Sequence, residues 1–374
     1  MTDVVSLARG LIRCPSVTPA EGGALDLCER FLKARGFQTW RLPFGEVDNL
    51  FARFGTASAH LCFAGHTDVV PVGDEADWTY PPFEAAIDGD RLYGRGAEDM
   101  KGNVAAALVA TSDFLAHNPG FDGSLSFLLT GDEEGLALNG TKKVLQWMAA
   151  NNHIPDQCLV IEPTATHHPG DTLKAGRRGS LNGMLTVTGT QGHAAYPQKA
   201  DNPLPRLVQL LNALIVPSLD EGTAHFEASS LQITTIDVGN SAVNIIPASG
   251  TAQFNVRFND TWTAVTLEAE LRRRLDSVGA SYELATTSNA SAFITPLEEL
   301  AHPLADALEV ATGIRPDLTT TGGTSDARFI QAYCPVVEMG LPGKTMHQVD
   351  EHISIAHLKE LTKLYGLAIR ALTQ

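Results

Sequence analysis

The sequence alternates between short, mainly apolar runs without charged residues and longer segments with helical periodicity. The apolar runs cover residues 61–64, 124–130 and 157–161, and an alanine-rich helical segment covers 103–116. Strands that are apolar along their whole length are typical of sheets covered on both faces. Their alternation with helices favours an α/β fold, in which ligands bind beyond the carboxyl ends of the strands.

The pattern changes near Gly179, where strands and helices follow one another in the order βαββαβ. These segments cover residues 181–188, 203–215, 231–238, 250–258, 262–276 and 281–287. This order is that of a ferredoxin-like α+β sandwich. From about residue 292 the first pattern resumes. We therefore expect one α/β domain formed by residues 1–178 and 293–374, interrupted by an inserted domain at 179–292.

Composition limits the partners and the compartment of the protein. The chain has 374 residues, enough for two domains with a large core, and its net charge of −16 argues against nucleic acid or an anionic membrane as a partner. The five cysteines are widely spaced and form no CxxC motif, which is typical of a reducing compartment. We find no signal-peptide pattern at the N-terminus and no apolar run of membrane-spanning length, so we expect a cytoplasmic protein.

Five polar residues follow apolar runs in short segments that contain glycine or proline: His66, Asp99, Glu134, Glu162 and His347. Two imidazoles and three carboxylates form a natural ligand set for two zinc-like ions with one carboxylate bridging. The four positive charges of two dications would balance the four negative charges of three carboxylates and one hydroxide. Because a dication lowers the pKa of water enough to form hydroxide at neutral pH, the pattern predicts hydrolysis.

Together these segments resemble the M20 family of zinc-dependent peptidases and deacylases, over nearly the whole chain. The general family motifs are residues 66–68, 99–102, 131–134 and 347. A narrower match, to the desuccinylases of this family, rests on residues 173–180, 192–197 and 321–329. Two positions depart from that pattern. Ile161 stands where desuccinylases usually carry glycine, and Gly343 stands where they often carry a substrate-facing asparagine.

The resemblance implies a zinc-peptidase-like catalytic domain with an inserted ferredoxin-like α+β dimerisation domain, and two Zn²⁺ per subunit with Co²⁺ as a substitute. It assigns His66 and Glu162 to one ion and Glu134 and His347 to the other, with Asp99 bridging the two.

The resemblance also assigns roles to residues beside the ligands. Glu133 would be the general base, and it can point away from the metal while its neighbour Glu134 binds it. Asp68 would orient His66, because residues two apart at a strand end share a face and can form a carboxylate–imidazole pair. His193 would act across the interface of a homodimer formed by the inserted domain, as a donor to the oxyanion.

The desuccinylase motifs imply that the chain removes succinate from N-succinyl-LL-2,6-diaminopimelate, a small N-acyl amino acid. Arginine suits its carboxylates because the guanidinium pairs with them in a bidentate manner, and the candidates are Arg177, Arg178 and Arg257. Further substrate contacts implied by the resemblance are Ser180, Tyr196, Asn244, Gly323 and Thr324.

Two other interpretations remain open. The chain could be a related deacylase, such as an acetylornithine deacetylase, or a dipeptidase of the same family. It could also be a catalytically inactive member that serves as a metal-binding interaction protein. The presence of Glu133 argues against the inactive protein, because such a protein has no need of the general base.

Overall fold

The computed structural model describes residues 3–373, and the chain divides into two compact units. The first contains the chain up to Ala175, together with Ile294–Thr319 and the chain from Ser325 onward. The second contains Gly176–Phe293 and Thr320–Thr324. These divisions lie close to the expected boundaries at 178 and 292. The assignment of Thr320–Thr324 to the second unit differs from the continuous C-terminal segment expected from the sequence.

The first unit is built on a mixed sheet whose described strands follow the order β1-β2-β6-β3-β7-β18-β8-β17. Their bounds are Gln38–Arg41 (β1), Asn49–Phe54 (β2), His60–His66 (β3), Ser124–Thr130 (β6), Gln157–Val160 (β7), Thr172–Lys174 (β8), Asp317–Thr319 (β17) and Val336–Glu338 (β18). Among the central strands, β3 pairs in parallel with β6 and with β7, and β7 pairs in parallel with β18. Every residue of β3 and β6 is buried, which confirms the predicted α/β sheet with both faces covered.

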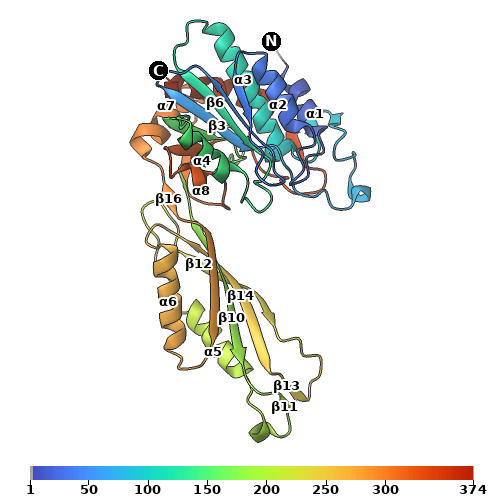
Figure 1. Ribbon diagram of the computed structural model, residues 1–374, viewed down its shortest axis with the longest axis vertical. Coiled ribbons are helices and arrows are strands. Elements are labelled where there is room, and N and C mark those ends of the chain that lie inside the picture. Colours follow the sequence, from blue (N-terminus) through green and yellow to red (C-terminus); the bar gives the residue numbers. More distant parts are fainter. Residues whose placement is uncertain (1–2, 374) are drawn as a thin grey trace. The chain divides into compact units, whose positions relative to one another are not determined.

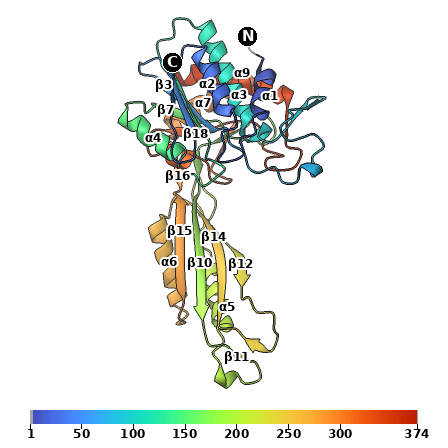
Figure 2. The same ribbon diagram turned by 45° about the vertical axis from the view of Figure 1, so that its right-hand side comes forward.

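Helices cover both faces of this sheet. Figure 2 shows α4 on one side of β3, β7 and β18, and α1, α3 and α9 on the other. The helices of this unit cover Val4–Ile12 (α1), Ala24–Lys33 (α2), Gly102–His117 (α3), Thr141–Ala150 (α4), His302–Thr312 (α7), Ala327–Ile330 (α8) and Ile355–Thr373 (α9). The main core lies between the sheet and the α1, α3 and α9 layer, where Phe63, Phe127 and Tyr365 are fully buried.

A small three-stranded sheet adjoins this layer. It consists of Ile87–Asp88 (β4), Arg91–Tyr93 (β5) and His352–Ser354 (β19), paired in the order β19-β5-β4. The antiparallel pairing of β19 with β5 holds the segment before β19 beside the segment after β5, and the amide of Gly94 donates to the main-chain oxygen of Glu351 at 2.8 Å. The segments around Gly94 and Glu351, which are far apart in the sequence, therefore lie side by side.

The second unit has the predicted ferredoxin-like arrangement (Figure 1). Its main elements are Gly179–Thr188 (β10), Leu204–Ile215 (α5), Ser230–Asp237 (β12), Ser249–Phe258 (β14), Ala264–Asp276 (α6) and Glu283–Ala290 (β15). The antiparallel sheet has the order β12-β14-β10-β15, and both helices pack on it. Its core contains Leu185, Phe254, Leu207 and Leu271, which the alternating strand pattern and the helical spacing turn inward.

None of the helices within residues 3–373 is long and apolar enough to cross a membrane. All five cysteines are free thiols, and four of them are buried.

Candidate metal centre

The topology of the first unit brings the five predicted ligands together. His66 is the last residue of β3, and Glu134 and Glu162 follow the ends of β6 and β7, the two parallel neighbours of β3. Parallel strands end at the same edge of the sheet, so these three side chains converge. Asp99 comes from the short helical turn Ala97–Lys101, directly before α3, and His347 comes from the loop before β19.

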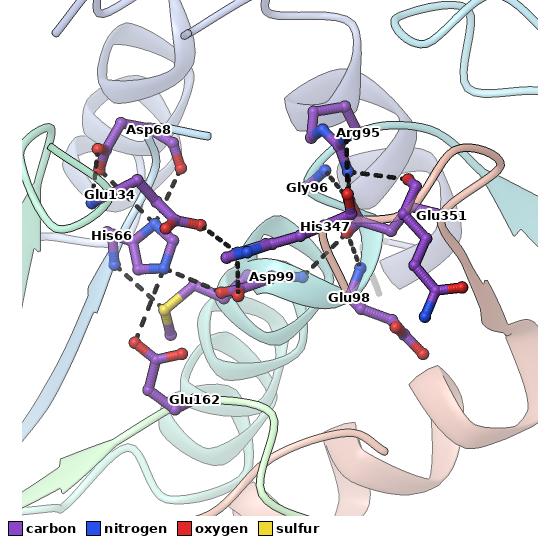
Figure 3. A network of polar contacts seen from close by, with 12 residues as sticks. His66, Asp68, Arg95, Gly96, Glu98, Asp99, Glu134, Glu162, His347 and Glu351 are labelled. Carbon is purple, nitrogen blue, oxygen red and sulfur yellow. Dashed lines mark hydrogen bonds and ion pairs between the residues drawn. The ribbon is translucent and has the colours of Figure 1, made fainter. Parts of the chain in front are cut away.

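Asp99 lies between two imidazole–carboxylate pairs (Figure 3). Its Oδ1 is 3.1 Å from Nε2 of His66, and its Oδ2 is 3.2 Å from Nε2 of His347. On the first side, Oε1 of Glu162 is 3.7 Å from Nε2 of His66, and on the second side Oε1 of Glu134 is 2.9 Å from Nε2 of His347. Each oxygen of Asp99 therefore faces one of the two predicted ligand pairs, as a bridging carboxylate requires.

The chemistry of this donor set fits a pair of dications. Ligand atoms of His66, Glu133 and Glu162 lie within 4.8 Å of one another, and so do those of His66, Asp99 and Glu134. These groups hold four carboxylates, which carry negative charge when ionised. Dications would supply the missing positive charge, with the nitrogen and oxygen ligands that zinc accepts.

The pKa values of the centre reflect its burial and the closeness of its carboxylates. Burial raises the pKa of the Glu133 carboxyl to about 8, and burial together with the nearby Asp99 raises the pKa of Glu162. Hydrogen bonds to Asp99 and Glu134 raise the pKa of His347 to about 10. In the absence of metal the cluster therefore retains protons, which dications would displace.

Asp68 is buried next to His66 and Glu134 and contacts both halves of this centre. Nδ1 of His66 is 2.9 Å from the main-chain oxygen of Asp68 and 3.6 Å from its carboxylate. The sequence predicts that the carboxylate orients the imidazole, and it lies within ion-pair distance of Nδ1, while the shorter, hydrogen-bonding distance is to the main-chain oxygen. The carboxylate instead accepts the amides of Glu133, at 3.3 Å, and Glu134, at 3.1 Å. Asp68 thus fixes the main chain from which the predicted base projects.

Sequence reasoning missed Glu98, although it adjoins a predicted ligand. Its side chain is buried and accepts the amides of Lys344, at 3.1 Å, and Thr345, at 2.6 Å. It therefore positions the loop that carries His347. The signal in the sequence was the Glu98-Asp99 pair, but adjacency alone does not show where a second carboxylate points.

The predicted substrate residues belong to the second unit. Arg177 is buried and donates to the main-chain oxygen of Gly323 at 3.1 Å, and Nη1 of Arg178 is 3.4 Å from Glu227. Ser180 and Arg257 are register partners on β10 and β14. The structure therefore groups Arg177 with Gly323 and Ser180 with Arg257. Thr324 ends the short segment Thr320–Thr324 of this unit, which also contains Gly323.

His193 lies in a separate ribbon of the second unit. Gly192–His193 (β11) pairs with Ile245–Ile246 (β13), and the ribbon also carries the predicted contact Asn244, whose main-chain oxygen accepts the amide of Ala194 at 2.8 Å. The His193 ring is exposed and lies 5.6 Å from the ring of Tyr196, another predicted contact. These three predicted residues are thus neighbours on one exposed ribbon.

Comparison with known proteins identifies the family. The sequence model of the family described as "Peptidase family M20/M25/M40" matches residues 62–371. The chain is 56% identical over 368 residues to succinyl-diaminopimelate desuccinylase of Rhodospirillum centenum, covering 97% of this chain and 95% of that protein. It is 54% identical over 369 residues to the enzyme of the same name from Beijerinckia indica, covering 96% of each.

Solved structures share the fold at much lower identity. An M20 metallo-carboxypeptidase from Sulfolobus solfataricus superposes with a TM-score of 0.78 at 16% identity, covering 100% of both chains. A dinuclear metal-binding peptidase of the M20 family from Bacillus subtilis superposes with a TM-score of 0.74 at 16% identity, covering 99% of this chain and 97% of the other. By sequence and by fold, this chain belongs to the M20 peptidase family, as its motifs predicted.

Proposed function

We propose that this protein hydrolyses the amide bond of N-succinyl-LL-2,6-diaminopimelate, giving succinate and LL-2,6-diaminopimelate, in bacterial lysine and diaminopimelate biosynthesis. The observation that carries the reaction class is the position of Asp99 between two imidazole–carboxylate pairs, with Glu133 in the same cluster. The substrate is taken from the names of relatives that share more than half of their residues with this chain along nearly its whole length.

Asp99 would bridge two Zn²⁺ ions, with His66 and Glu162 on one and Glu134 and His347 on the other. Bound at this centre, the ions would polarise the amide carbonyl and increase the acidity of water. Glu133 accepts the proton of the attacking water and delivers it to the leaving amine. Asp68 holds the amides of Glu133 and Glu134, so that the base and the ligand project from a fixed main chain.

Substrate recognition would fall to the second unit. Arg177, Arg178 and Arg257 are the guanidinium groups proposed for the carboxylates of the substrate. The contact of Arg178 with Glu227 is 3.4 Å long and Glu227 is exposed, so a carboxylate of the substrate could replace it. Further contacts are proposed for the hydroxyl and amide groups of Ser180, Tyr196, Asn244 and Thr324 and for the main chain of Gly323.

A substrate panel tests this function. Zinc-loaded protein should release succinate from N-succinyl-LL-2,6-diaminopimelate with a much higher kcat/KM than it releases acetate from N-acetylornithine or cleaves a dipeptide. Glu133→Gln protein, carried through the same preparation, controls for a contaminating hydrolase. A preference for N-acetylornithine or for dipeptides would contradict the assigned substrate. No turnover of any amide by metal-loaded protein would instead favour an inactive binding protein.

We also propose that the protein is a homodimer formed through the second unit, in which His193 reaches the metal centre of the partner. Apolar side chains exposed on α5 and β12 support an interface, among them Val208, which is 66% exposed, and Ile236, which is 56% exposed. The strand β12 is also an edge of its sheet, where main-chain groups are open to pairing. Two-fold symmetry would bury the same surface on both copies.

Zinc is the proposed resident metal, with cobalt as a substitute, because imidazole and carboxylate ligands suit both ions. We propose a cytoplasmic location, which the five free thiols support, since thiols persist in a reducing compartment.

A further inference from the structure

Glu351 is a buried carboxylate that the proposed chemistry does not use. Its Oε1 accepts the amides of Glu98, at 2.8 Å, and Asp99, at 3.1 Å. Its Oε2 accepts the amide of Gly96 at 3.0 Å and Nη1 of Arg95 at 2.7 Å. The side chain has no exposed surface, and these four hydrogen bonds all go to the segment that ends in Asp99 (Figure 3).

Arg95 extends this network to the loop that carries His347. Its guanidinium donates to the main-chain oxygens of Gln348, at 3.1 Å, and His347, at 3.4 Å. His347 has φ of +64°, a left-handed conformation that residues with a side chain rarely adopt and that persists where the surroundings hold it. The hydrogen bonds of Arg95 hold the main chain at this position.

We infer that Glu351 is a positioning residue that holds ligands of both ions of the metal pair in place, an inference that rests on the proposed function. It fixes the main chain of Asp99, which would bridge both ions. Through Arg95 it also fixes the main chain of His347, which would bind one of them. A carboxylate suits this place because two oxygens can accept all four donors and balance the charge of Arg95. A carboxamide has one acceptor oxygen and would turn an NH₂ group toward two of the donors.

The first experiment is Glu351→Gln, measured by zinc binding rather than by activity alone. Chelated protein is titrated with zinc against a chromophoric competitor, and folding is followed by circular dichroism. Loss of a group that orients metal ligands typically weakens metal affinity by about 10–100-fold, and we expect a loss in this range at both sites. Because every ligand remains, saturating zinc should restore kcat to near the wild-type value. A residue that only stabilised the fold would leave both zinc affinities unchanged.

The second unit offers a matched control. Asp220 is also a carboxylate that accepts four donors, at 2.6–3.0 Å, namely the amides of Gly222 and Ser229 and the side chains of Asn259 and Trp262. Asp220→Asn removes a comparable set of hydrogen bonds far along the sequence from the ligands. We expect it to lower the unfolding temperature while both zinc affinities stay at the wild-type value.

Arg95→Lys tests the contacts with the His347 loop separately from the contacts with the Asp99 segment. Lysine keeps a positive charge for Glu351 but lacks the fork that reaches His347 and Gln348. We expect about a 10-fold loss of affinity for the ion held by His347 and Glu134, and a smaller loss for the ion held by His66 and Glu162. If Glu351→Gln does not fold, this variant decides the question.

Folded Glu351→Gln protein that binds both ions with wild-type affinity would overturn the inference. So would Arg95→Lys protein with both affinities unchanged. Wild-type protein that binds no zinc would be a different result, because it would refute the proposed metal centre itself.

Discussion

Asp68 accepts the main-chain amide of Glu134 at 3.1 Å, so a buried carboxylate next to β3 holds the loop that follows β6. The same side chain accepts the amide of Glu133, and its main-chain oxygen lies beside Nδ1 of His66. A single residue therefore sets the relative positions of a proposed zinc ligand on β3 and of the proposed base on the neighbouring loop.

Asp68→Asn should lower kcat more than it lowers zinc affinity. Asparagine retains the main-chain oxygen that faces His66, but its NH₂ group would face the amide of Glu133 or Glu134 and displace that loop. Displacement of a catalytic group by about 1 Å can cost about 100-fold in rate, and we expect a loss of that order. Steady-state kinetics with zinc content measured on the same samples checks this. An unchanged rate would show that the loop does not depend on Asp68.

Glu133→Gln and Glu134→Gln should separate proton transfer from metal binding. Glutamine at 133 cannot accept the proton of water, and general acid–base catalysis is typically worth about 10²–10⁴-fold, so kcat should fall by at least that factor while zinc stays bound. Glutamine at 134 should instead weaken zinc binding. Elemental analysis and kinetics measure the two effects. Equal zinc content and equal residual rates in the two variants would contradict the division of roles.

Zinc affinity should rise with pH through the neutral range. Hydrogen bonds to Asp99 and Glu134 raise the pKa of His347 to about 10. Burial lowers the pKa of His66, but the hydrogen bond to Asp99 and the negative charges of the nearby carboxylates together raise it well above its usual value. Zinc must displace these protons, so lower pH favours the protonated, metal-free site. An unperturbed imidazole, with a pKa of about 6.5, is already neutral above neutral pH, so protons would no longer compete with zinc there. Competition titrations between about pH 7 and pH 9 should therefore show increasing affinity, and a constant affinity would contradict the raised pKa values.

Mixed dimers test whether His193 acts on the partner subunit. His193→Ala and Glu133→Gln should each be nearly inactive, since removal of one oxyanion donor typically costs about 10²–10³ in kcat. If His193 serves the partner, a mixed dimer has one site with both defects and one with neither, and activity should return. Native mass spectrometry establishes subunit exchange. Exchange without recovery of activity would place His193 at the site of its own chain.

Much of this fold could be predicted because its strands and helices carry strong local signals. The sequence predicts the strand Ser124–Thr130 with the observed bounds, since this run is mainly apolar, has no charged residue and ends before Gly131. The helix expected at 262–276 begins at Ala264, because Thr263 forms a capping box with Thr266 and fixes the start of the helix. A capping box with threonine at both positions is a weaker sequence signal for the start of a helix than the usual pairing of threonine with glutamate.

The sequence predicts the five proposed metal ligands, and the structure brings these side chains together, whereas the residues that support them are harder to predict. Each ligand lies in a glycine- or proline-containing segment beyond an apolar run, a local signal. Glu351 accepts the amide of Asp99, 252 residues earlier, and such a pairing depends on the β5–β19 contact that only the folded chain reveals. The spacing of two residues predicts that the carboxylate of Asp68 faces His66, from which it lies 3.6 Å. That it also accepts amides from a distant loop has no such local signal.

The proposed metal centre is tested most directly by the rate of succinate release from N-succinyl-LL-2,6-diaminopimelate as zinc is added back to fully chelated protein. With Asp99 shared between two ligand pairs, we predict no turnover without metal and a rate that rises until two zinc ions are bound per subunit. Full activity in the chelated protein, or a rate that does not change as zinc binds, would contradict the proposed metal centre.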